Sequence, residues 1–211
     1  MDIDRKRLID SYQKIREDIK NTKEENLISC FKIIKSHFNL PVEVRKIDKE
    51  KFLSEIKDIF FSMLENVYTI SIEWVEKEYN IKFNERIDYE TLEKLTYSDD
   101  GKTIDERLED HYKNTVSRKR NYIDYFYNRI VTIFDNEALY ASNHVIHGKL
   151  HRKATHVEVL NFNDDICWDH EECEVWLKRG KIPIEELSEI PPYHPVCECY
   201  VIYYIEEEEE K

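Results

Sequence analysis

The sequence contains very little glycine and proline, with only 3 Gly and 5 Pro among its 211 residues. Long flexible linkers between domains are therefore not expected. It has no glycine-rich phosphate-binding loop and no Gly-x-Ser-x-Gly motif, so the common nucleotide-binding and serine-hydrolase signatures are missing. No stretch approaches the roughly 20 apolar residues of a membrane span, and the opening MDIDRKRLID holds no apolar signal-peptide core. We therefore expect neither a membrane span nor a secretory signal.

The cysteine number and the net charge limit the environment and the partners. Five cysteines is an odd number, which fits poorly with a closed set of disulfides in a secreted protein. Metal binding or free thiols in a reducing compartment fit better. The formal net charge of -13 argues against a protein that coats DNA, but permits a basic protein partner. The clearest basic cluster, Arg118 to Arg120, is typical of a solvated helix face and less often of a contact with phosphate or an acidic partner.

Apolar residues recur every three or four positions through most of the chain, which predicts helices. A Thr103–Glu106 capping box marks one helix start, and Pro41 should end another. We expect helices over 3–19, from Asn21 or Thr22 to Phe38, over 51–79, over 88–95, and from Thr103 to about Lys149 with a break between Asn114 and Arg120. Residues 42–47 should form a connector between helices.

The pattern changes after Gly148 to an alternation of apolar and polar residues. Residues 154–162 and 199–205 each alternate with a period of two, which predicts two strands. The sequence thus predicts a mainly helical α+β protein, with a helical body over 1–153, a small two-stranded Cys/His-rich module over 154–205 and an acidic tail over 206–211.

Four of the five cysteines and two histidines lie in the segment between Asn163 and Ile205. Thiolate and imidazole ligands in two close groups are typical of tetrahedral zinc, and a module of about 50 residues commonly needs such support. Cys197 and Cys199 would share one face of a regular strand, which permits both to bind. The preferred ligand set is Cys167, His170, Cys197 and Cys199, with Cys173 as the first substitute and His194 as the second.

Three other interpretations compete with a structural zinc site. The cysteines could simply be buried free thiols. His170-Glu171-Glu172 followed by Pro195-Val196-Cys197-Glu198-Cys199 resembles a zinc-deaminase signature, but only one residue separates these thiols, and they should open a helix rather than a strand. His144, His147 and His151, with Glu137 two turns earlier, could form a second metal or proton-handling site, although such a row is more often a polar stripe.

The end of the chain resembles phage minor head proteins of the Mu F type, the head morphogenesis family. The resemblance rests on Pro192-Tyr193-His194-Pro195-Val196-Cys197-Glu198-Cys199 and on Cys167, with His170 where the family usually has a second cysteine. Arg129, Glu137 and Asn143 are similar to the Arg, Glu and Asn that family members carry upstream of this module. Two features depart from the family pattern: a Gly is usual near the second cysteine, and Glu198 replaces an Arg.

The resemblance implies a non-enzymatic structural protein of the virion head. Such a protein would bind the portal, the major capsid protein or both, lie in the host cytoplasm during assembly, and take no small-molecule substrate. The alternatives are a zinc-dependent enzyme of the hydrolase or deaminase type and a small zinc-bearing adaptor protein. For partner binding, we expect the aromatic stretch 122–134 and the basic cluster to matter more than the acidic tail.

Overall fold

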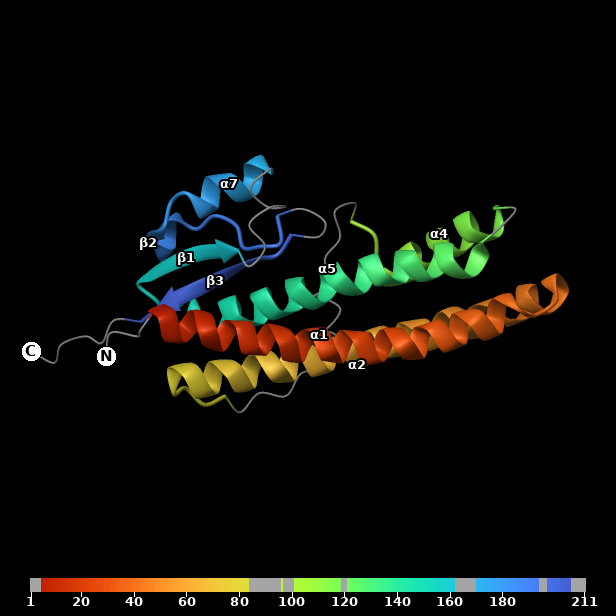
Figure 1. Ribbon diagram of the computed structural model, residues 1–211, viewed down its shortest axis with the longest axis horizontal. Coiled ribbons are helices and arrows are strands. Elements are labelled where there is room, and N and C mark those ends of the chain that lie inside the picture. Colours follow the sequence, from red (N-terminus) through yellow and green to blue (C-terminus); the bar gives the residue numbers. More distant parts are fainter. Residues whose placement is uncertain are drawn as a thin grey trace, which may run out of the picture.

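The computed structural model describes residues 5–83, 96, 101–118, 121–161, 170–193 and 197–205. Three long helices, of 34, 38 and 29 residues, lie side by side (Figure 1). A small sheet packs at the end of these helices where the first helix begins. The elements are α1 (Arg5–Phe38), α2 (Val42–Tyr79), α4 (Ile104–Val116), α5 (Tyr122–Leu150), β1 (His156–Asn161), α7 (Glu171–Leu177), β2 (Lys181–Pro183), a 3-10 turn (Ile184–Glu186) and β3 (Cys199–Tyr204).

The first two helices form one long hairpin, and this corrects two predictions. The expected helices over 3–19 and 21–38 are one continuous helix, α1, because neither Asn21 nor Thr22 breaks it. Ile19 and Leu27 are both buried, so packing on either side of these polar residues outweighs their capping preference. Residues 42–47, expected as a connector, form the first turns of α2, which begins directly after Pro41. Proline suits this place because it has no N–H group to leave unbonded.

The remaining helical predictions agree with the structure where it describes them. Thr103 and Glu106 form the expected reciprocal capping box at the start of α4. The expected break lies between Val116 and Tyr122, and α5 then runs to Leu150. The predicted helix over 88–95 and the acidic tail lie outside the described residues. None of the helices in the described ranges is long and apolar enough to cross a membrane.

The sheet is antiparallel and has the strand order β2-β1-β3. The two predicted strands are confirmed as β1 and β3, but the expectation of only two strands was wrong. The third strand, β2, has three residues and pairs Ile182 with Val157. A strand this short offers no alternation that could identify it from the sequence. Every residue of β3 is buried, which makes it the central contact between the sheet and the helices.

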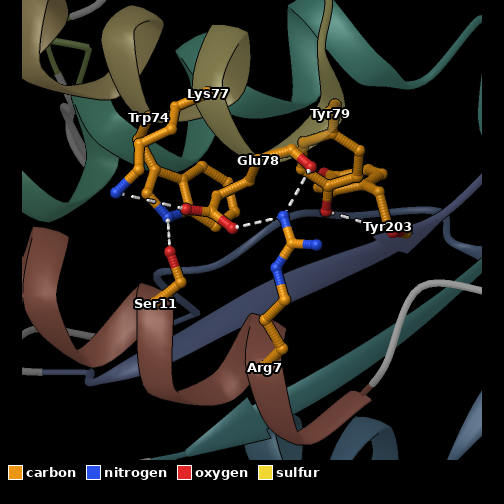
Figure 2. Close-up of polar contacts among 7 residues, drawn as sticks. All are labelled: Arg7, Ser11, Trp74, Lys77, Glu78, Tyr79 and Tyr203. Atoms are coloured by element: carbon orange, nitrogen blue, oxygen red, sulfur yellow. Dashed lines mark hydrogen bonds and ion pairs between the residues drawn. The ribbon is translucent and has the colours of Figure 1, made fainter.

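Several polar and aromatic contacts fasten the sheet to the helices. Tyr12 of α1 stacks on Tyr200 of β3 with ring centroids 4.2 Å apart. The Arg5 guanidinium donates two hydrogen bonds, of 2.8 and 2.9 Å, to the Glu158 carboxylate. Figure 2 shows a neighbouring network, in which the Tyr79 hydroxyl donates to the Tyr203 carbonyl at 3.1 Å. One hydrophobic core therefore runs from the helical body into the C-terminal module.

Candidate metal centre

Three buried cysteines lie together where the C-terminal module meets the helical bundle. Their sulfur atoms all lie within 4.8 Å of one another, and the residues are Cys173, Cys197 and Cys199. The Sγ atoms of Cys173 and Cys197 are 3.6 Å apart. The three residues are at most 3% exposed. Three soft ligands at this separation can hold one metal ion.

Local structure explains how the three thiols converge. Cys173 lies in the first turn of α7, where Glu171, Glu172 and Glu174 favour the positive end of the helix dipole. Its buried neighbour on the same helix face is Trp176, so this face of α7 points inward. Cys199 is the first residue of β3 and Cys197 lies two positions before it, and the sulfur atoms of both residues meet that of Cys173.

The structure agrees with part of the predicted ligand set. Cys197 and Cys199 meet as expected, and Cys173, the first substitute, joins them. His170 is exposed at the N-cap of α7 and is not a member of this group. Cys167 and His194 lie outside the described residues. Cys30 is buried in α1, and burial raises the pKa of its thiol to about 12, so it is a core residue with little tendency to ionise.

The thiols affect the acidity of one another. Hydrogen bonding from the Cys199 thiol lowers the pKa of Cys197, although burial acts in the opposite direction. Tyr193 is close to all three thiols, and its pKa is raised, mainly by burial and further by these sulfur atoms. The cluster thus favours at least one thiolate, the form of cysteine that binds metals.

Asn143 of α5 links the helical bundle to the backbone that carries the cysteines. Its side-chain NH2 group donates to the carbonyls of Cys199 and Pro191, both at 3.2 Å. Its side-chain oxygen accepts a hydrogen bond from the Tyr12 hydroxyl at 2.8 Å. Asn143 is only 3% exposed, so these bonds replace water that cannot reach it.

We expect the Asn143→Ala variant to lose about 3 kcal/mol of unfolding free energy, because two carbonyls and one hydroxyl would lose a buried partner. Urea unfolding followed by circular dichroism measures this loss. Asn128→Ala, at an exposed position of the same helix, is the matched control and should change stability by less than about 0.5 kcal/mol. Equal stability of the two variants would contradict the linking role of Asn143.

The histidine row of α5 does not gather as a metal site in the part of the chain that the structure describes. His147 Nδ1 lies 2.9 Å from the Tyr203 hydroxyl, and His151 Nδ1 donates to the His147 carbonyl at 3.0 Å. Burial lowers the pKa of His144 to about 4 and also lowers that of His147. Glu137, the carboxylate expected beside the row, instead pairs with Arg107 of α4. His144 and His147 therefore favour their neutral forms, and His147 packs against Tyr203 of β3.

The deaminase interpretation lacks its expected structure, because Cys199 begins strand β3 rather than a helix. A cavity of about 630 Å³ does open beside Cys197, between α1 and α5. Its lining includes Arg16 and Glu198, which form an ion pair of 2.7 Å. A small molecule could reach the edge of the cysteine cluster through this cavity.

Comparison with known proteins gives no relative of this chain: no family model, no curated protein and no solved structure matches it.

Proposed function

We propose that this chain is a non-enzymatic structural protein of a tailed-phage head, and that one zinc ion holds its C-terminal module. Cys173, Cys197 and Cys199 would supply three ligands, and the sequence offers Cys167 or His194 as the fourth. Two thiolates bound to one tetrahedral zinc at 2.3 Å lie about 3.8 Å apart. The 3.6 Å between Cys173 and Cys197 supports this assignment.

The contact of Asn143 with Cys199 carries the proposal of a head protein. The resemblance to minor head proteins rests on two separate parts of the sequence, an upstream helix with Asn143 and the His-Pro-x-Cys-x-Cys segment. The Asn143 side chain donates to the carbonyl of Cys199, 56 positions away. The two parts that carry the resemblance thus form one structural unit, as they should if they belong to the same module.

In this role the protein acts by binding rather than by chemistry. It would attach to the portal, the major capsid protein or both during assembly in the host cytoplasm, and remain in the virion head. Its net charge of -13 disfavours direct binding to packaged DNA, so any proximity to the genome would be indirect.

Mass spectrometry of purified heads tests the proposal. Heads made by the phage that encodes this chain should contain it at low copy number. A variant that lacks residues 206–211 should enter heads nearly as well as the natural chain, because a short charged tail gives mainly salt-sensitive attraction. A protein that is abundant in the infected cell and missing from purified heads would refute the assignment.

One observation favours the alternative of a zinc-dependent hydrolase or deaminase. The cavity beside Cys197 could admit a substrate to an open coordination position. X-ray absorption of the zinc-loaded protein separates the two candidates. Four sulfur or nitrogen ligands from the protein support a structural role, whereas three such ligands and one water support the enzyme. A zinc-bearing adaptor of the host cell would have a closed site but would not copurify with portal or capsid.

A further inference from the structure

The end of the helical bundle that is remote from the sheet has an unusual distribution of charge. This distal tip consists of the turn between α1 and α2, the end of α4 and the start of α5 (Figure 1). Among the described residues of this tip, residues 35–47 contain three basic residues (Lys35, Arg45, Lys46) and one acidic residue, residues 113–118 contain two basic residues and no acidic residue, and residues 122–129 contain one of each. The tip is therefore basic in a chain whose net charge is -13.

Three arginines of the distal tip lie on aromatic rings. Arg118 lies 3.5 Å from the centre of the Tyr125 ring, and Arg129 lies 5.3 Å from the same centre. Arg45 lies 5.5 Å from the centre of the Tyr122 ring and also approaches Phe38. Stacking of this kind fixes the planes of the guanidinium groups before any anion arrives.

None of these three arginines forms an ion pair with a carboxylate among the described residues. Elsewhere the protein pairs its arginines with acids, as in Arg5–Glu158, Arg7–Glu78 and Arg179–Glu186. The Nε atom of Arg45 is buried and has no hydrogen-bond acceptor. A buried donor without a partner is uncommon in a folded protein.

Exposed aliphatic side chains lie on the same helix ends as Arg45 and Arg118. Val42, Val44 and Ile47 lie in the first turns of α2, and Ile47 is 86% exposed. Val116, at the end of α4 beside Arg118, is 45% exposed. Arginine and tyrosine at the centre of an apolar surface are typical of residues that dominate protein interfaces.

We propose that the distal tip binds an acidic segment of a partner protein that also carries aliphatic side chains. Its carboxylates would meet the guanidinium groups of Arg45, Arg118 and Arg129, and its aliphatic groups would cover Val42, Val44 and Ile47. Nucleic acid is a poorer occupant, because a phosphate backbone offers nothing to the aliphatic residues and the net charge of the chain repels it. This proposal goes beyond the proposed function and does not depend on the metal site or on a virion location.

The test measures binding of the zinc-loaded full chain to three fluorescent probes by anisotropy. The first probe is a peptide of alternating Glu and Leu, the second replaces Glu with Lys, and the third is a single-stranded oligonucleotide of the same charge as the first. The Glu-Leu peptide should bind and the Lys-Leu peptide should not. The Arg118→Gln, Arg129→Gln double variant should bind the Glu-Leu peptide at least about tenfold more weakly, since two charge-assisted contacts are lost.

A charge-matched double variant at Lys14 and Lys153, both exposed and outside the distal tip, should bind the Glu-Leu peptide within about twofold of the natural chain. Ile47→Ser should also weaken binding, which a purely electrostatic contact would not predict. Three results would overturn the proposal: no binding of the Glu-Leu peptide to the natural chain, tighter binding of the oligonucleotide, or equal losses in the two double variants.

Discussion

Protein made in zinc-replete medium should contain one zinc per chain, and serine at Cys173, Cys197 or Cys199 should remove most of it. Each of these residues supplies one of three mutually close sulfur atoms, and serine is a poor zinc ligand. Elemental analysis of the purified protein measures the effect. Less than half an equivalent of zinc in the natural protein would contradict the metal site.

Variants outside the cluster serve as controls and identify the fourth ligand. Cys30→Ser should keep its zinc, because Cys30 lies within the core of the helical bundle. His170→Ala should also keep it, since His170 is exposed and outside the cysteine group. Of Cys167→Ser and His194→Ala, one should lose zinc and the other should not. Zinc loss in His170→Ala, but not in Cys173→Ser, would restore the ligand set preferred from the sequence.

Removal of zinc should affect the two parts of the chain unequally. Structural zinc contributes directly to folding, with binding free energies of about 10–16 kcal/mol in small zinc peptides. After chelation, hydrogen exchange should therefore rise first in α7 and β3, which carry the cysteines. Helix α4 is an internal control, because it packs on α2 and α5 away from the cysteines. An equal rise in α4 would show that the C-terminal module is not a separate unit of stability.

Helix periodicity predicts most of the fold because a long amphipathic pattern averages over many residues. The runs that became α2, α4 and α5 carry their buried residues at the expected spacing. Local capping signals were less reliable. Asn21 and Thr22 could cap a helix, yet they continue α1, because burial of Ile19 and Leu27 against other helices favours one straight element.

The candidate site could be predicted only where its geometry is local. Cys197 and Cys199 are two positions apart where the chain enters β3, so their convergence could be expected from their spacing in the sequence, and the structure brings their sulfur atoms together. Cys173 approaches these two cysteines only because of the way α7 packs. The spacing of residues in the sequence therefore could not show that Cys173 is a better candidate ligand than His170. The apolar residue Trp176, one helical turn later, is the signal in the sequence that places Cys173 on an inward face. Nothing in the sequence around Asn143 predicts that its side chain contacts Tyr12, Pro191 and Cys199.

Arg107→Met should be among the most destabilising single substitutions outside the metal site. Glu137 of α5 is fully buried, and Arg107 of α4 forms an ion pair with its carboxylate. Removal of one partner from a buried ion pair takes a close counter-ion from the remaining charge, which typically costs about 3–5 kcal/mol. Urea unfolding at neutral pH should show a loss of this size.

Two further variants separate the buried charge from general loss of packing. The Arg107→Met, Glu137→Leu double variant should recover most of the stability, since two apolar side chains can fill the same space without a charge. Lys57→Met is the matched surface control, because Lys57 pairs with Asp105, which is 63% exposed, and such pairs contribute about 0–1 kcal/mol. If the double variant is as unstable as Arg107→Met, the pair is required for packing between α4 and α5 rather than for neutralising Glu137. If Lys57→Met loses as much as Arg107→Met, burial is not what makes the Arg107–Glu137 pair important.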